Sequence, residues 1–324
     1  MNIEFHYYAV YYLAREAGAD DAFCRVLARS SQYVDEATTA LAVEGPHGRE
    51  SFEPTQNYVF WDEKVMRDIY LPFHFLPGDP GSASSLRRDG KSNPYAVTPN
   101  GSIAKSLVIR AFKDKDPFLM GIALHAFADS WAHQNFSGLM EAWNELPSSS
   151  AGALPAAGHL HALAKPDAPD GVWQDGRLVP GSERVVNRGR FLEAAGKIYR
   201  YLCVFTGKGF ADEEPVLGRL DGLWQRPSRE ERLADYVIEL GVEPWDRKLW
   251  LSEAGLPVDD SPLAGIRHYD KLSWAKAELR RALGSQPPVH RVDGRFHSSS
   301  LYRWYEASAE HRRRAQAALA GAGL

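Results

Sequence analysis

Apolar residues recur along most of this chain with the spacing of helices, whereas the alternation typical of strands is scarce. Residues 3–17 are apolar almost all round and stop at Gly18, which is typical of a largely buried helix with a glycine cap. A second helix is predicted from Asp20 or Asp21 to about Leu41. Further helical periodicity is found near residues 103–112, 187–204, 229–240, 272–283 and 301–320.

The strongest helical pattern lies in residues 116–138, which read DPFLMGIALHAFADSWAHQNFSG. An aspartate followed by a proline at its start is typical of a helix N-terminus. Within this helix His125, Asp129 and His133 are spaced four residues apart. Four residues advance a helix by only about 40° past a full turn, so all three side chains project from one face.

This polar row is interleaved with apolar residues, so we do not expect it to face solvent freely. Buried imidazoles and carboxylates are costly unless something pairs with them, and a divalent metal ion does so. Two neutral imidazoles around one carboxylate suit zinc better than calcium or magnesium, which prefer all-oxygen sites. The alternative is a hydrogen-bond ladder of histidine, aspartate and histidine in a helical core, and this helix alone leaves both interpretations open.

Residues 44–100 are rich in proline, glycine and serine, and we expect loops there with one short helix near 62–70. Residues 81–101 read as an exposed surface loop. His74 lies in the sequence LPFHFLPGD, between two prolines. A histidine in a stiff apolar loop is a candidate metal ligand, because the entropy of the loop is already reduced. It is equally typical of a packed loop residue.

A second polar cluster follows a flexible connector at residues 148–158 and contains His159, His161, Asp167 and Asp170. If the segment HLHALA is helical, His159 and His161 point away from each other. At most one of these two histidines is therefore expected to join the central row.

Two residues near the N-terminus have ordinary interpretations when each is considered alone. His6 lies in the first turn of the first helix and is typical of a core or cap histidine. Asp35 lies in the second helix among small side chains that would let a backbone or an ion approach, and alone it is typical of a solvated carboxylate. They become candidate metal ligands when they are considered together with the histidines and aspartates that follow them in the chain.

Composition excludes several classes of protein. With 324 residues, 44% hydrophobic, 25% charged and a formal charge of −4, the chain is typical of a globular protein without a general attraction to nucleic acid or anionic membrane. The arginines at 312–314 are typical of a solvated helix face, with nucleic acid or lipid head groups as the alternative. Cys24 and Cys203 lie in apolar helical patterns and are expected in the core.

Targeting signals are not apparent in the sequence. No stretch approaches the roughly 20 apolar residues of a transmembrane helix. The N-terminus carries Glu4 and lacks a basic leader, so it does not resemble a secretory signal. We therefore expect a cytoplasmic protein, with export by a route that needs no cleaved leader left open.

The ordered set of histidines and aspartates resembles the superfamily of zinc-dependent phospholipase C and the single-strand-specific zinc nucleases. The set comprises His6, Asp35, His74, His125, Asp129, His133, His159 and Asp167. More narrowly, SSQYVDEA, PFHFLPG, HAFADSWAHQNFSG and the GH…PD cluster look like an uncharacterised bacterial family related to that superfamily. The resemblance implies an all-α, multi-helix bundle with long loops, in which residues 1–205 form a metal-binding core and residues 206–324 a helical extension packed on it.

The resemblance also implies a ligand set. A first metal ion would be held by Asp35, His74, His125 and Asp129. A second ion, close to the first, would share Asp129 and take His6. Asp35 matches the carboxylate that also positions or deprotonates the attacking water, so it is the expected catalytic residue.

A third metal ion would use His133 and His159, with Asp167 as its final carboxylate. The superfamily places an acid four residues after the second histidine, where this chain has Leu163. Extracellular members also bind metal through an N-terminal tryptophan, where this chain has Met1, whose amine is a candidate substitute. We therefore expect two zinc ions, and a third only if Asp167 completes the last site.

Two divalent ions about 3.5–4 Å apart lower the pKa of a bridging water and hold the attacking and leaving oxygens of a phosphodiester in line. We expect a zinc-dependent phosphoester hydrolase, with phospholipids, nucleotides and single-stranded nucleic acid all open as substrates. The alternative is a non-catalytic helical protein with a structural metal site that binds a partner. Aromatic residues near the ligands either contact the substrate or, for most, belong to the core: Tyr7, Tyr8, Tyr11, Tyr12, Tyr33, Trp131 and Phe136.

Overall fold

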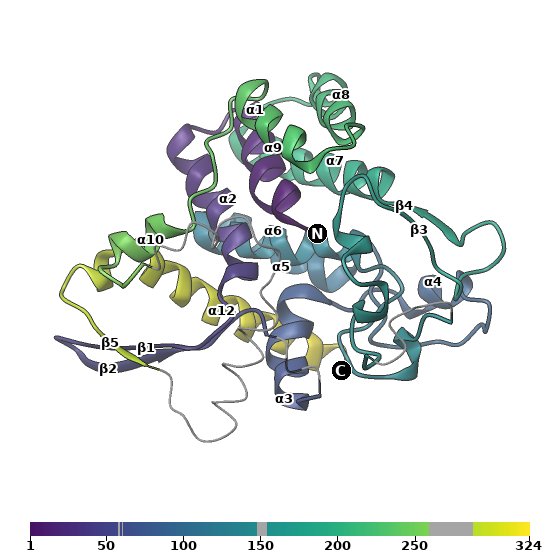
Figure 1. The fold of residues 1–324 in the computed structure, drawn as a ribbon, viewed down its shortest axis with the longest axis horizontal. Helices are drawn as coiled ribbons and strands as arrows, with labels where there is room; N and C mark the ends of the chain where they lie inside the picture. The colour runs from purple at the N-terminus through teal and green to yellow at the C-terminus, as the bar shows by residue number, and fades with distance from the viewer. Residues whose placement is uncertain (58, 60, 148–153, 259–287) are drawn as a thin grey trace.

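The computed structural model describes residues 1–57, 59, 61–147, 154–258 and 288–324. The helix α6 (Pro117–Ala132) lies in the middle of the fold (Figure 1). Asp116 caps it by accepting a hydrogen bond from the Phe118 N–H, and every residue after Pro117 is buried. Apart from the face with His125 and Asp129, this helix is almost entirely apolar and must be covered by other elements, which explains its central place.

Within the described residues, four long helices and one π-helical segment pack around α6. They are α2 (Asp21–Glu36), α5 (Ser102–Asp114), α7 (Asn187–Thr206), α12 (Ser300–Gly321) and η2 (Met66–His74). The helices α2 and α6 approach each other closely at Gly121, where a Cβ atom would overlap the Leu27 carbonyl oxygen and lie 2.6 Å from the Ser30 Cβ. Only glycine lets the two backbones come this near.

The two segments that carry His6 and His74 are π-helical. The first, η1 (Glu4–Ala9), continues into α1 (Val10–Glu16). The second, η2, follows the short helix α3 (Glu63–Val65) and contains Pro72. His74 is therefore the last residue of a helical segment, and the prediction that it lies in a stiff loop was wrong. Single π-turns inside helices are frequent at functional sites, because they shift a side chain out of the helical register.

Two small sheets overturn the expectation of an all-α bundle, and the fold is mixed α and β with helices predominating. The strand β1 (Leu41–Gly45) pairs antiparallel with β2 (Gly48–Phe52) and parallel with β5 (Val289–Arg291). The strand β3 (Val172–Gln174) pairs antiparallel with β4 (Arg184–Val186). Strands of three to five residues are too short to show clear alternation, and β1 occupies positions assigned to the end of a helix and a loop.

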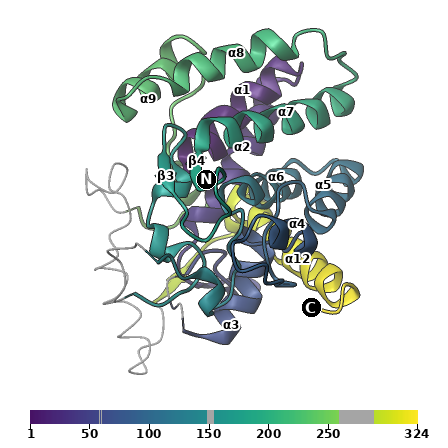
Figure 2. The same ribbon diagram turned by 90° about the vertical axis from the view of Figure 1, so that its right-hand side faces the viewer.

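The last third of the chain adds α8 (Glu213–Trp224), α9 (Arg229–Ile238) and α10 (Lys248–Glu253) to α12. Figure 2 shows α8 and α9 in an upper layer with α1 and α7, while α12 lies below with α5 and α6. The helices predicted near residues 103–112, 187–204, 229–240 and 301–320 are confirmed, and that predicted at 272–283 lies outside the described residues. Shorter elements are α4 (Pro80–Ser85), η3 (Ala142–Asn144), η4 (Leu160–Ala162), η5 (Lys165–Asp167) and η6 (Phe296–Ser298).

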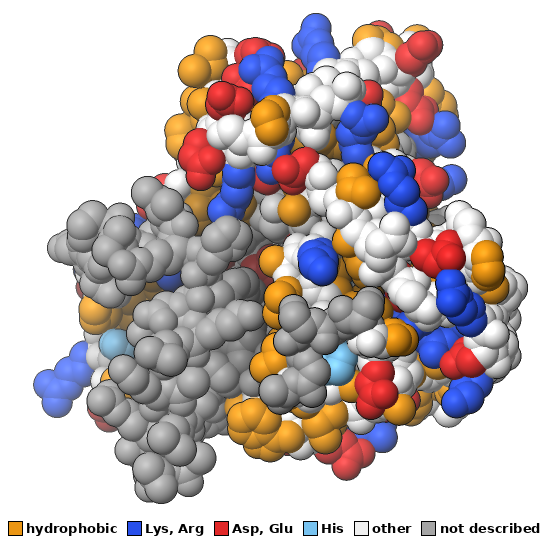
Figure 3. Space-filling model, turned by 45° about the vertical axis from the view of Figure 1, so that its right-hand side comes forward, with side chains coloured by type: hydrophobic (Ala, Val, Ile, Leu, Met, Phe, Trp, Pro, Cys, Tyr) orange, Lys and Arg blue, Asp and Glu red, His pale blue; other side chains and the backbone are white. Residues whose placement is uncertain are grey.

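The basic run on α12 makes contacts within the protein. Arg312 donates hydrogen bonds to the carbonyl oxygens of Asp68 and Pro54, at 2.9 and 2.7 Å. Arg313 and Arg314 both pair with Glu310. On the face in Figure 3, acidic and basic side chains of the described residues are interspersed. Among the described residues, every helix is too short or too polar to traverse a lipid bilayer.

Candidate metal centre

Three ligand-type atoms converge beside α6. The Nδ1 atom of His74 lies 3.3 Å from the Nε2 atom of His125 and 3.3 Å from Oδ2 of Asp129, and the last two atoms are 3.4 Å apart. Oδ1 of Asp35 lies 3.9 Å from the His74 nitrogen and 3.7 Å from the His125 nitrogen. Zinc bonds of about 2.0–2.1 Å give a tetrahedron with edges of about 3.3–3.4 Å, so these residues fit such an ion.

The second nitrogen of each of these two histidines is bound to a backbone carbonyl. Nε2 of His74 donates to the Thr55 oxygen at 2.9 Å, and Nδ1 of His125 donates to the Ser31 oxygen at 2.8 Å. A carbonyl oxygen only accepts, so each of these nitrogens carries the proton. In the neutral rings the two facing nitrogens are therefore both lone-pair donors, which attract a cation and repel each other.

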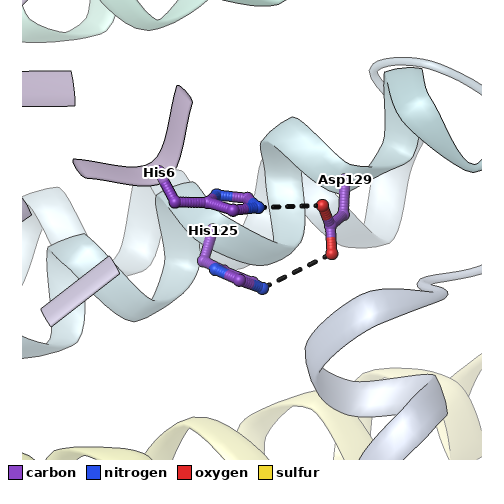
Figure 4. Close-up of side chains that lie close together, drawn as sticks. All are labelled: His6, His125 and Asp129. Atoms are coloured by element: carbon purple, nitrogen blue, oxygen red, sulfur yellow. Dashed lines mark hydrogen bonds and ion pairs between the residues drawn. The ribbon is translucent and has the colours of Figure 1, made fainter. Parts of the chain in front are cut away.

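His6 and the amino group of Met1 lie on the other side of Asp129. Nε2 of His6 is 3.1 Å from Oδ1 of Asp129, and the Met1 amine also donates to that oxygen. The ring of His6 stacks on that of His125 with centroids 3.7 Å apart. Figure 4 shows His6 and His125 directed at the two oxygens of Asp129, which is the arrangement of a bridging carboxylate.

A third group lies one turn further along α6. Nε2 of His133 is 3.3 Å from Oδ1 of Asp167, and Nε2 of His159 is 3.6 Å from Oδ2 of the same carboxylate. The Nδ1 atoms of these histidines donate to the carbonyl oxygens of His74 and Leu163, both at 2.8 Å. Each ring is thus held by a carbonyl and presents its other nitrogen to the site, as metal-binding histidines do.

Burial and charge shift the acidities of the group. Burial raises the pKa of Asp35 to about 8 and lowers that of His6 to about 4. Burial also lowers the pKa of His125 and of His159. Against the effect of burial, the Met1 amine and the surrounding imidazoles hold the pKa of Asp129 well below its usual range. His6, His125 and His159 are thereby kept neutral, as metal binding requires, whereas against the effect of burial the hydrogen bond and charge of Asp129 raise the pKa of His74.

The group has a closed side and an open side. His6, His125 and Asp129 are at most 1% exposed. The side chains of Asp35, Asp167 and His159 are 17%, 21% and 22% exposed. A ligand from solvent would therefore meet these three residues first.

All eight predicted site residues lie in this region, and they form three groups that could hold a metal ion. His161 lies apart from them, because its Nε2 donates to the Leu154 carbonyl oxygen at 2.8 Å. Asp170 also faces away, toward Arg232. The sequence did not single out the carbonyls of Ser31, Thr55 and Leu163, which no side-chain pattern signals. The aromatic residues Tyr7, Tyr8, Tyr11, Tyr12, Tyr33, Trp131 and Phe136 are all buried, as are Cys24 and Cys203.

Comparison with curated proteins and with solved structures finds no match. No link to the phospholipase C and nuclease superfamily is found, so that resemblance stays an expectation. Residues 1–319 match a family described as "Family of unknown function (DUF6765)". The chain therefore belongs to the DUF6765 family.

Proposed function

We propose that this protein is a zinc-dependent hydrolase of phosphoesters that uses a metal-activated water. The observation that carries the proposal is the convergence of His74 Nδ1, His125 Nε2 and Asp129 Oδ2 within 3.3–3.4 Å of one another. A hydrogen-bond ladder needs a second proton on His74, which the charge of Asp129 favours by raising the pKa of that ring. With both rings neutral, their protons are bound to carbonyls on the far side, so a metal ion is the partner that satisfies all three atoms.

The resemblance to the zinc phospholipases C and zinc nucleases gives the proposal its reaction class. Bound divalent ions would supply a water of lowered pKa and neutralise charge on the phosphoryl oxygens. Two ions are proposed at the inner groups, around Asp129. A third is proposed at His133, His159 and Asp167, where the Met1 amine lies 3.5 Å from Asp167.

Asp35 is the proposed catalytic residue. Its carboxylate lies at the open side of the group, within 4 Å of two ligand nitrogens. A carboxylate at this position accepts a hydrogen bond from a water bound at the centre. Asp35 would therefore orient the attacking water and accept its proton.

The substrate class is proposed only as far as phosphoesters. Phospholipids, nucleotides and single-stranded nucleic acid fit the same chemistry. The alternative function, a structural metal site in a partner-binding protein, is favoured by the burial of His6, His125 and Asp129. The exposure of Asp35, His159 and Asp167 favours the hydrolase, since a purely structural site has no need of an open side.

The test combines metal content with turnover. Protein purified without a metal column is analysed by elemental mass spectrometry and assayed on bis(p-nitrophenyl) phosphate, in the wild type, His125→Ala and Asp35→Asn. We expect two or three zinc equivalents in the wild type and fewer in His125→Ala. Asp35→Asn should keep most of its metal and lose at least about 100-fold in turnover, as removal of a general base does.

The outcomes separate the two functions. Metal binding without turnover on this ester, on phospholipid or on single-stranded nucleic acid, together with unfolding on chelation, would support the structural alternative. A metal content near zero that added zinc does not raise would leave a hydrogen-bonded histidine cluster and end both proposals.

A further inference from the structure

Arg232 on α9 is a buried arginine whose carboxylate partners lie in two other segments. It is 2% exposed, and it forms a bidentate pair with Glu4, with Nε–Oε2 at 2.6 Å and Nη2–Oε1 at 3.0 Å. It also pairs with Asp170, with Nη1–Oδ2 at 3.1 Å and Nη2–Oδ1 at 3.2 Å. Nη1 also donates to the Arg226 carbonyl oxygen at 2.7 Å. This hydrogen bond ties the guanidinium to the segment that leads into α9.

Both carboxylates belong to segments that bring ligand-type groups to the candidate metal centre. Glu4 is in η1, two residues before His6. Asp170 follows Asp167 by three residues. The same two segments meet a second time where the Met1 amine lies 3.5 Å from Asp167. Arg232 therefore links η1 and residues 165–170, the two segments that also meet at the Met1 amine and Asp167.

We propose that Arg232 is a positioning residue that holds η1 and residues 165–170 at the separation the metal centre needs. The inference rests on the proposed metal centre, and it assigns a role to α9, a helix that contains none of the eight site residues. A guanidinium binds two carboxylates in a fixed plane, so it sets the relative position of Glu4 and Asp170 as a flexible lysine does not.

Stability alone does not explain this arrangement. Taking a guanidinium and Glu4, which is 0% exposed, out of water carries a desolvation cost that the pairing only offsets, and apolar residues of similar volume often replace such pairs without loss. What an apolar cluster does not supply is a fixed geometry between charged groups. The group of His133, His159 and Asp167 depends on a fixed position for Asp167. Asp167 lies at the end of the three-residue element η5, so contacts from neighbouring residues such as Asp170 must hold it in place.

The test uses Asp170→Asn as its main variant. This change removes one charge from a partly exposed residue and leaves the buried pair of Arg232 and Glu4 intact, so the protein should fold. Asp235→Asn is the control for loss of a charge on the same helix, because Asp235 pairs with Arg226 at 2.6 Å rather than with Arg232. Arg232→Lys keeps the positive charge but removes the planar guanidinium that binds both carboxylates.

Two measurements are made on the full chain. Hydrogen exchange on chelator-treated protein reports the metal-free state, and we expect faster exchange in residues 2–9 and 165–171 for Asp170→Asn and Arg232→Lys but not for Asp235→Asn. Cobalt titration against a competing chelator reports the centre, and we expect the weakest-bound ion to lose 10-fold or more in affinity in the same two variants.

The results distinguish this inference from the proposed function. A wild type that binds no cobalt would end the proposed metal centre. A wild type that binds cobalt, with exchange and affinity within twofold of it in Asp170→Asn, would overturn the role of Arg232 alone. Equal changes in Asp170→Asn and Asp235→Asn would also overturn it, because they would reduce Arg232 to a general stabiliser of α9.

Discussion

At the scale of single residues, the ring nitrogen of each histidine that is bound to a backbone carbonyl is what favours a metal site over a ladder of hydrogen bonds. His125 and His74 were predicted as ligands from their place in the sequence, but a ladder of hydrogen bonds was an equally good interpretation of the row. Only the carbonyls of Ser31 and Thr55 fix which nitrogen carries the proton. Backbone carbonyls have no sequence signature, so this evidence becomes visible only in the fold.

His159 tests the third group separately from the inner ones. It contacts Asp167 but is 22% exposed, so truncating it should remove about one metal equivalent and leave the inner groups and the fold intact. The measurement is metal content by elemental mass spectrometry together with the melting temperature of the metal-free protein. His161→Ala is the control, because His161 lies two residues away and faces the Leu154 carbonyl. Equal metal content in the two variants would remove the third site.

His311 predicts a pH dependence of stability. It is buried, donates to the Pro72 carbonyl oxygen at 3.0 Å, and burial lowers its pKa to about 4. The unfolded chain takes up the proton first, so the stability due to neutral His311 is fully present above about pH 6.5 and is lost as pH falls toward 4. At pH 5 this loss amounts to about 2 kcal/mol.

His311→Gln keeps a donor for the Pro72 oxygen but does not titrate. Between pH 7 and pH 5, we expect the free energy of unfolding of this variant to fall by about 2 kcal/mol less than that of the wild type, as measured by urea unfolding. The same pH slope in both proteins would show that His311 is accessible to protons in the folded state.

At the scale of elements, the sequence predicted best where local signals and burial agree. The start of α6 was predicted correctly because Asp116, Pro117 and the apolar run all indicate the same boundary. The segment η2 was predicted as a short helix followed by a loop, because Pro72 disfavours an α-helix and a π-turn depends on what packs against it. The pairing of β1 with β5 joins residues from opposite ends of the chain, which no local pattern indicates.

The crossing of α2 and α6 gives a prediction for Gly121. An added methyl group would overlap the Leu27 carbonyl oxygen and lie 2.6 Å from the Ser30 Cβ, so the helices must move apart. We expect Gly121→Ala to cost at least about 2 kcal/mol in the free energy of unfolding. Metal affinity should fall as well, because α2 carries Asp35 and the Ser31 carbonyl that holds His125.

Gly218→Ala is the matched control for that change. Gly218 is also inside a helix, α8, but nothing lies within 4 Å of an added Cβ. We expect a gain of up to about 1 kcal/mol from the better helix propensity of alanine. Similar urea midpoints for the two variants would mean that α2 and α6 do not approach closely in solution.

At the scale of the whole molecule, the candidate centre is built from distant parts of the chain. Its groups come from η1, α2, η2, α6 and residues 159–167, and α12 binds two of these segments from outside. Trp304 donates to the Ser30 carbonyl oxygen at 3.0 Å, and His311 donates to that of Pro72. The candidate ligand residues could be listed from the sequence, but a role for the last third could not be predicted, because an arginine such as Arg232 in a charged helix is typical of a solvated surface.

This arrangement predicts that metal removal lowers the stability of the entire fold. An ion that binds only the folded chain stabilises it by about 2.7 kcal/mol when free metal is 100-fold above its dissociation constant. With an unfolding entropy of about 2.1 cal/mol/K per residue, a chain of 324 residues shifts by about 1.5 °C in melting temperature for each kcal/mol. We therefore expect chelation to lower the melting temperature by about 4 °C if one ion is bound and by about 8 °C if two are bound. His125→Ala should show a smaller shift with chelator than the wild type, since both inner groups lose a ligand and the group of His133, His159 and Asp167 stays complete. An equal effect of chelator on both proteins would place the stabilising ion elsewhere, because His125 takes part in both inner groups of ligands.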